Sequence, residues 1–265
     1  MWGAVIGDLI GSIYEYEQAT NFHFIDMNDK RMPEELITKE SFFSDDTILT
    51  IAALDAILND GDYEKYLKIY ALAYEDKVPE NIPYFEKMFS KRFLNWVKTG
   101  TNNKSTGNGA LMRLSPVAYL FDDYIKLHEN LFRLTSTSHH SSEALSNSYL
   151  MGQIIFFANK GLSKEEIIEK LSINLEYKDF NKFNMTCLDT IGNCLYAAFT
   201  SDNYIDAVRK VISYGGDTDT NACITGAIAE ALYGIDESLI KLAKTKIPIS
   251  FTEKLELGYQ MMLKK

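Results

Sequence analysis

The chain has 265 residues, of which 46% are hydrophobic and 24% charged, a composition typical of globular enzymes. Its formal net charge of −10 argues against an extended nucleic-acid surface, because DNA and RNA are bound through positive charge. We find no linker, repeat or low-complexity segment that would divide the chain, so we expect a single domain over residues 1–265.

The cysteines and the apolar segments indicate the cellular compartment of the protein. Cys187, Cys194 and Cys223 are few, odd in number and form no CxxC pair, which fits a reducing compartment. The apolar start, residues 1–13, contains Asp8 and lacks the basic region of a signal peptide. No other apolar stretch is long enough to span a bilayer. We therefore expect a cytoplasmic protein that does not enter a membrane.

Helical periodicity recurs along most of the chain, and the alternation typical of β-strands is almost absent. The first expected helix, residues 1–14, places Gly3, Gly7 and Gly11 four residues apart, a smooth stripe that favours close packing against another backbone. This spacing does not match the glycine pattern of nucleotide-binding loops. We expect further helices at residues 46–58, 63–74, 83–97, 142–159, 163–171, 185–199, 205–213, 219–233, 237–243 and 252–263. The predicted fold class is all-α, as one compact orthogonal multi-helix domain.

Two acidic clusters lie far apart in the sequence, and each directly precedes an expected helix. The first, Ser44-Asp45-Asp46-Thr47, taken alone is better explained as a helix cap. The second, Gly215-Gly216-Asp217-Thr218-Asp219-Thr220, supplies more oxygen atoms than a cap needs. Carboxylates brought this close repel one another unless a cation neutralises them, and ligands made only of oxygen suit Mg²⁺, Mn²⁺ or Ca²⁺. Together the clusters predict a site for two ions that activates water, as in a hydrolase.

Two loops are further candidates for binding. Residues 99–109 are rich in Gly, Asn, Ser and Thr, so their N–H groups could cradle phosphate oxygens, although such loops are usually plain connectors. The loop at residues 135–142 carries His139-His140. Adjacent histidines point in different directions, so we do not expect both to bind one metal, and solvated loop residues are the default interpretation.

The ordered set of motifs resembles the ADP-ribosylglycohydrolase family. Five motifs in the right order are more specific than any one of them, and they cover nearly the whole chain. They are Gly3-Ala4 through Gly7-Asp8 with Gly11 and Glu15; Phe43-Ser44-Asp45-Asp46-Thr47; Thr106-Gly107-Asn108-Gly109-Ala110-Leu111-Met112-Arg113; Ser138-His139; and Gly215-Gly216-Asp217-Thr218-Asp219-Thr220.

The resemblance implies a compact all-α protein with two Mg²⁺ (or Mn²⁺) ions. Family positions for metal ligands fall on Ser44, Asp45, Asp46, Asp217, Asp219 and Thr220. Glu15 matches an acidic position implicated in catalysis, and we assign Asp45 and Asp219 to the catalytic set with it. Gly107, Asn108 and Gly109 match a loop that lies against ADP-ribose, and His139 a position near the diphosphate. Ser138, and Ser141-Ser142, depart from the Thr and the His-Pro of many relatives.

The predicted function is metal-dependent hydrolysis of the N- or O-glycosidic bond between ADP-ribose and an acceptor. The acceptor is a protein side chain such as Arg or Ser, a small molecule or a nucleic-acid base, and the expected partner is an ADP-ribosylated protein or an ADP-ribose-containing small molecule. Such cleavage passes through an oxocarbenium-like state and needs a positioned water. One alternative is an ADP-ribose-binding protein of the same fold without turnover. The other, a dinuclear phosphoester hydrolase, is disfavoured because metal-ligand histidine patterns are absent. We expect a monomer.

Overall fold

The computed structural model describes residues 1–21, 36–79, 87–101, 104–178 and 183–264, with side chains except those of residues 15–21. The described residues form helices and no β-sheet, so the all-α prediction is confirmed. The helices are α1 (Trp2–Asn21), α2 (Asp45–Leu58), α3 (Tyr63–Tyr74), α4 (Lys91–Thr99), the short 3₁₀ helix η1 (Asn108–Ala110), α5 (Ser115–Leu120), α6 (Tyr124–Ser136), α7 (Ser142–Asn159), α8 (Lys164–Leu171), α9 (Cys187–Phe199), α10 (Tyr204–Ser213), α11 (Thr218–Tyr233), α12 (Glu237–Lys244) and α13 (Ile249–Leu263).

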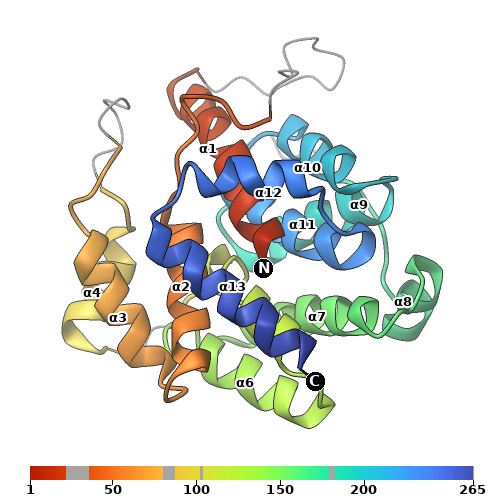
Figure 1. Cartoon of the computed structure of the whole chain (residues 1–265), viewed down its shortest axis with the longest axis horizontal. Helices are drawn as coiled ribbons and strands as arrows, with labels where there is room; N and C mark the ends of the chain where they lie inside the picture. Colours follow the sequence, from red (N-terminus) through yellow and green to blue (C-terminus); the bar gives the residue numbers. More distant parts are fainter. Residues whose placement is uncertain (22–35, 80–86, 102–103, 179–182, 265) are drawn as a thin grey trace.

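Helices α1 and α11 form the centre of the molecule and make its most extensive helix–helix contact. Both are buried along most of their described length, so water reaches neither from most directions. Around this pair, α3 and α4 lie on one side and α7 to α10 on the other, while α13 crosses the near face (Figure 1). No helix among the described residues is both long and apolar enough to cross a membrane.

The glycine stripe of α1 packs against the backbone of α11, as the four-residue spacing predicted. A methyl group added at Gly7 would overlap the carbonyl oxygen of Ala222, and one at Gly3 would overlap that of Gly226. At Gly11 the same methyl would strike Thr218. The two helices therefore run antiparallel at a separation that side chains would prevent. This close approach places the acidic residue beside Gly7 next to the start of α11.

Helix α4 begins later in the chain than predicted. We expected a helix over residues 83–97, whereas α4 begins at Lys91 and residues 87–90 are not helical. The Ser90 hydroxyl accepts a hydrogen bond from the N–H of Phe93 at 3.2 Å, which satisfies a free donor of the first turn and fixes the start. Residues 83–86 lie outside the described part of the chain.

Two helices were not predicted, for different reasons. All six residues of α5 are buried, so the segment has no polar face and shows no amphipathic period. Helix α6 does carry the signal, because the buried Leu127, Leu131 and Leu134 recur at helical spacing behind an Asp123 cap. The sequence of α6 therefore contains a helical pattern from which this helix is predictable.

Candidate metal centre and substrate cavity

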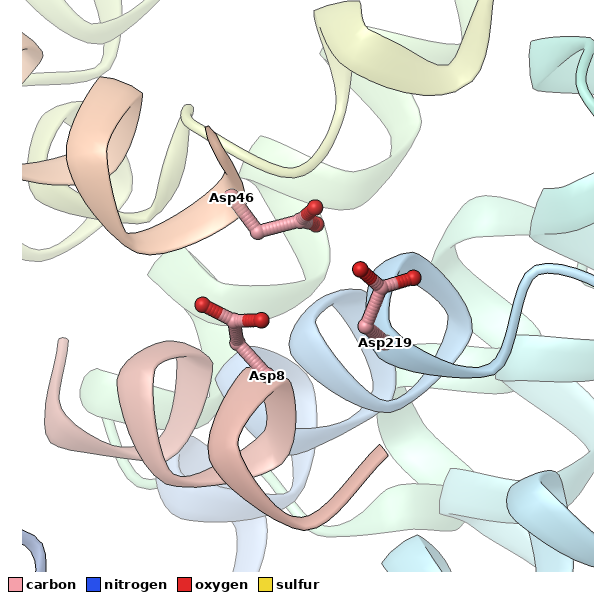
Figure 2. A group of neighbouring side chains, drawn as sticks. All are labelled: Asp8, Asp46 and Asp219. Atoms are coloured by element: carbon pink, nitrogen blue, oxygen red, sulfur yellow. The ribbon is translucent and has the colours of Figure 1, made fainter. Parts of the chain in front are cut away.

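Three carboxylates from three helices meet at the N-terminal ends of α2 and α11. Asp8 from α1, Asp46 from α2 and Asp219 from α11 each offer an oxygen atom, and these atoms all lie within 4.8 Å of one another. Figure 2 shows the three side chains pointing toward a common centre. All three residues are buried. The two acidic clusters of the sequence are therefore parts of one site, and α1 contributes a third part.

Asp8 is held by hydrogen bonds from the turn that opens α2. One oxygen accepts from the Ser44 hydroxyl at 2.8 Å, and the other accepts from the Ser44 N–H at 2.9 Å. The second oxygen also accepts from the N–H and the hydroxyl of Thr47, at 3.1 and 2.5 Å. Asp8 thus ties α2 to α1, and its oxygen atoms already have protein donors.

Ser44 also acts as the helix cap that the first cluster suggested. Its hydroxyl oxygen accepts from the N–H of Asp46 at 3.2 Å, and the same oxygen lies 3.1 Å from Oδ2 of Asp46. Thr220 donates to that Oδ2 from the opposite side, at 3.2 Å. The other oxygen of Asp46, Oδ1, is buried without a hydrogen-bond partner among the described residues. A buried charged oxygen in this state is costly unless a cation meets it.

The second cluster is shaped by a glycine turn and an amide network. Gly215 and Gly216 have φ angles of 75° and 78°, a backbone conformation that favours glycine. The carboxamide oxygen of Asn184 accepts from the N–H of Asp217 at 3.3 Å, and its nitrogen donates to Asn221 at 2.9 Å. Asn108 donates to Oδ2 of Asp217 at 2.6 Å, which joins the predicted substrate loop to the acidic cluster.

The electrostatics of the cluster favour a bound cation. Burial, reinforced by the neighbouring charge of Asp219, raises the pKa of Asp8 to about 7. The same causes raise the pKa of Asp45, Asp46 and Asp217 well above the usual range of a carboxyl group. Carboxylates in such a state take up either protons or a positive ion. An all-oxygen donor set with one unpartnered oxygen fits Mg²⁺ or Mn²⁺.

A cavity of about 510 Å³ opens beside the cluster. The lining includes carboxylates and the Thr220 hydroxyl, the 105–109 loop with His139, and a mixed set of aromatic, aliphatic and basic side chains. The volume suits a small-molecule site, which typically measures roughly 300–1,000 Å³. The lining includes Asp45, Asp217, Asp219, Thr220, Gly107, Asn108, Gly109, His139, Arg92, Arg113, Phe89 and Phe93.

Two short backbone links shape the loop wall. Lys104 pairs with His139 and Gly107 with Thr186 as isolated β-bridges. The N–H of Asn108 donates to the carbonyl oxygen of Met185 at 2.9 Å. These links hold the glycine-rich loop against the start of α9 and beside His139, so the backbone there is fixed rather than a plain connector.

Comparison with known proteins agrees with this geometry. A sequence profile described as ADP-ribosylglycohydrolase matches residues 1–262. The chain belongs to the ADP-ribosylglycohydrolase family.

Individual members of the family are distant relatives. The chain is 25% identical to the ADP-ribosylarginine hydrolase Tri1 of Pseudomonas putida, over 88% of this chain and 69% of that one. It is 20% identical to the ADP-ribosylhydrolase ARH3 of Mus musculus, over 89% and 83%. A solved structure described as an ADP-ribosylglycohydrolase-related protein complex superposes with a TM-score of 0.64 at 19% identity, covering 98% of this chain and 93% of that one. The last comparison shows a shared fold.

Most residues expected from the family resemblance lie together. Asp45, Asp217, Asp219, Thr220, the loop Gly107–Gly109 and His139 all line the cavity. Ser44 and Asp46 lie buried directly beside it in the acidic cluster. Glu15 belongs to α1, but its side chain is outside the described residues. His140 is exposed and packs edge-on against Phe132, so only one of the two adjacent histidines faces the site.

Sequence reasoning missed three contributors to the family site. Asp8 lies in the first motif but was not expected in the metal site, although an acid beside a glycine within an apolar helix is a recognisable signal. Asn184 has no local pattern that marks it, because its partners are Thr190, Asn221 and the turn before α11. Arg113 closes the 106–113 motif, and it is buried with its Nη2 atom 2.6 Å from the Ser138 hydroxyl.

Proposed function

We propose that the protein hydrolyses the glycosidic bond between ADP-ribose and an acceptor. The observation that carries this proposal is the buried acidic cluster, with its unpartnered Asp46 oxygen, opening into a cavity walled by the Gly107–Gly109 loop and His139. Membership in the ADP-ribosylglycohydrolase family supports the same reaction class.

We further propose that two Mg²⁺ (or Mn²⁺) ions bind at the cluster. Bound there, they would polarise a water molecule and orient the hydroxyls of the ribose. The Oδ1 atom of Asp46, which has no hydrogen-bond partner among the described residues, is the strongest single argument for this ion site. The proposed ligands are six residues drawn from the two acidic motifs. They are Ser44, Asp45, Asp46, Asp217, Asp219 and Thr220. Asp8, saturated with protein donors, would orient Ser44 and Thr47 behind this set.

The chain's own residues would prepare the substrate for attack. Asn108 holds the Asp217 carboxylate by its hydrogen bond and so joins loop and cluster. The loop backbone and His139 would contact ADP-ribose across the cavity. Asp45, half-buried at the cavity wall, and Asp219 both line the cavity, and we propose them as further members of the catalytic set. We assign the proton transfer to Glu15, because it matches the acidic family position implicated in catalysis.

Glu15→Gln tests that assignment. The amide keeps the shape and reach of the side chain but takes up no proton, so turnover should fall by roughly 10²–10⁴-fold, the usual contribution of general acid–base assistance. ADP-ribose should still bind with near-normal affinity, measured by calorimetric titration in saturating Mg²⁺. Asp45→Asn is the comparison. Because it alters a proposed metal ligand, it should weaken binding of both the ion and ADP-ribose. Equal loss of binding in the two variants would place Glu15 among the ligands instead.

The acceptor is a separate question. The name of the Pseudomonas putida relative says that it acts on ADP-ribosylarginine, and an ADP-ribosylated arginine is therefore one candidate substrate. We therefore propose an ADP-ribosylated protein, or a small molecule that contains ADP-ribose, as the partner. We also propose that the protein acts as a monomer in the cytoplasm, where its three buried free cysteines would stay reduced.

Product analysis decides between this proposal and its rivals. The purified protein is incubated with ADP-ribosyl-arginine, ADP-ribosyl-serine and poly(ADP-ribose), with Mg²⁺ or with excess chelator. Release of ADP-ribose from at least one substrate, abolished by the chelator, is the expected result. Tight ADP-ribose binding without product from any of them would indicate a binding protein, and cleavage of a phosphodiester instead would indicate the phosphoester hydrolase.

A further inference from the structure

The two ring nitrogens of His139 have different surroundings. Nδ1 faces the protein, 2.8 Å from the hydroxyl oxygen of Ser138 and 3.4 Å from Nη2 of Arg113. Nε2 faces the loop wall, where a methyl group added at Gly107 or Gly109 would lie 3.4 or 3.7 Å from it. No hydrogen bond joins Nε2 to the rest of the described chain. Protein contacts therefore hold the ring at Nδ1 and leave Nε2 without a hydrogen bond among the described residues, in a side chain that lines the cavity.

The direction of the hydrogen bonds behind the ring follows from the chemistry of the groups. A guanidinium has only donors, so the contact of 2.6 Å from Arg113 Nη2 to Ser138 Oγ leaves the hydroxyl oxygen as the acceptor. The hydroxyl hydrogen then has Nδ1 of His139 within reach as its acceptor. A proton on Nδ1 would instead face the N–H groups of Arg113. The arrangement is satisfied only when Nδ1 carries a lone pair.

The positive charges around the ring also favour an uncharged imidazole. Arg113 is fully buried, and its Nε and Nη1 atoms have no hydrogen-bond partner among the described residues. Burial, together with the positive charges of Arg113 and Arg92, holds the pKa of His139 well below its usual range. A protonated imidazole would add a third positive charge beside these two. His139 is therefore neutral at ordinary pH.

We propose that Arg113 is a positioning residue that acts through Ser138 to keep His139 neutral with its proton on Nε2, so that the cavity wall presents a fixed N–H donor to an anionic oxygen of the ligand. Only the identity of that ligand rests on the proposed function. His139 would bind and orient, and it would not transfer protons during the reaction. The positive charge of Arg113 is buried behind the ring, and its Nε and Nη1 atoms have no hydrogen-bond partner among the described residues. It would add to the attraction for an anion, although the nearby Asp45 offsets part of it.

The tautomer can be read directly by nitrogen-15 NMR of the ligand-free protein. The chain has four histidines, so His139→Gln identifies the resonances of His139 in a long-range proton–nitrogen spectrum. We expect a protonated Nε2 and an unprotonated Nδ1, unchanged as the pH passes through about 6.5, where a free imidazole titrates. A protonated Nδ1, or titration near that pH, would overturn the proposal.

Variants of Ser138 test the relay itself. Ser138→Ala removes the hydroxyl, so both tautomers should appear, while Ser138→Thr keeps a hydroxyl and should restore the single Nε2–H form. Ser148→Ala is the matched control, since Ser148 is also buried but its hydroxyl has no hydrogen-bond partner among the described residues. A Ser138→Ala spectrum identical to that of wild type would show that Arg113 does not act through Ser138.

Calorimetric titration with ADP-ribose separates this proposal from the proposed function. Losing one oriented hydrogen bond should weaken binding roughly two- to tenfold in Ser138→Ala, with Ser138→Thr and Ser148→Ala near wild type. If wild type has the expected tautomer but does not bind ADP-ribose, the proposed function fails and the relay stands. If wild type binds ADP-ribose with Nδ1 protonated, the relay fails and the proposed function stands.

Discussion

At the scale of single residues, chemically identical side chains have different tasks because their surroundings differ. Asp8 receives four hydrogen bonds, two of them from backbone N–H groups. Asp46, which belongs to the same carboxylate cluster, receives hydroxyl contacts at one oxygen and none at the other. The first carboxylate therefore serves the fold, and the second is available to an ion.

This difference predicts different outcomes for two alanine substitutions. Both remove a repelling charge, but Asp8→Ala also leaves the buried N–H groups of Ser44 and Thr47 without an acceptor, so metal-free Asp8→Ala should be less stable than metal-free Asp46→Ala by about 1–3 kcal/mol. Asp46→Ala strands only hydroxyls, which can rotate, and removes a repelling charge, so metal-free stability should change little. Urea denaturation in the presence of chelator makes the comparison.

Added Mg²⁺ gives the second half of the test. Wild type should gain stability with Mg²⁺ because an ion that binds only the folded chain shifts the equilibrium. Asp46→Ala should lose most of that gain together with turnover. If Mg²⁺ stabilised Asp46→Ala as strongly as wild type, Asp46 would not be a metal ligand.

At the scale of elements, the contact between α1 and α11 sets the geometry of the site. Gly7 meets the backbone of Ala222 directly, and the next residue along α1 is Asp8. A side chain at residue 7 would push α1 away from α11 and so separate Asp8 from Asp219. The helix pair thus fixes the spacing of the carboxylates.

Gly7→Ala should therefore destabilise the protein by about 1–3 kcal/mol, the usual cost of overpacking, although alanine has the higher helix propensity. Turnover should fall even under conditions where the variant is fully folded, because Asp8 and Asp219 move apart. Gly192→Ala is the control, since α9 leaves open space within 4 Å of a methyl group there, and it should be neutral or slightly stabilising. Thermal unfolding and turnover of both variants give the result. Equal behaviour of the two would mean that α1 and α11 can separate without cost.

The elements also show what the sequence reveals and what it hides. Periodicity placed α3 and α7 at their observed bounds, because it is a local pattern of neighbouring residues. The two acidic clusters were expected to meet because their carboxylates need a common cation, and the glycine loop was expected beside them from the family resemblance; residues of all three line one cavity. The wholly buried α5 has no polar face to reveal it. The hydrogen bonds of Asn184 and the contact of Arg113 with Ser138 join segments far apart in the chain, and no spacing rule predicts them.

At the scale of the whole molecule, part of the negative charge lies in the interior, where a charged carboxylate is most costly. The formal net charge is −10, and several carboxylates share one buried cluster. Their pKa values are raised in the folded chain, by burial first and then by one another. The metal-free fold therefore binds more protons than the unfolded chain does at mildly acidic pH.

These raised pKa values determine how the stability of the metal-free protein changes with pH. Because the pKa of Asp8 is about 7 in the folded chain, against an ordinary value of 3.8, the metal-free protein should lose stability as the pH rises from about 4 to 7. Saturating Mg²⁺ should offset this loss, so the stability difference between Mg²⁺ and chelator should widen across the same window. Urea denaturation at four or five pH values measures both curves. A constant difference at every pH would mean that the carboxylates are already neutralised without an ion.

The close pairing of α1 with α11 has a consequence for synthesis on the ribosome. Asp8 and the glycine face of α1 are made first, whereas Ala222, the backbone they pack against, lies more than two hundred residues later. Until that stretch leaves the exit tunnel, the nascent chain carries an uncovered glycine groove and the first half of an acidic cluster that has no second half. A message truncated before the codon for Asp219 therefore yields a product in which the acidic cluster cannot be completed.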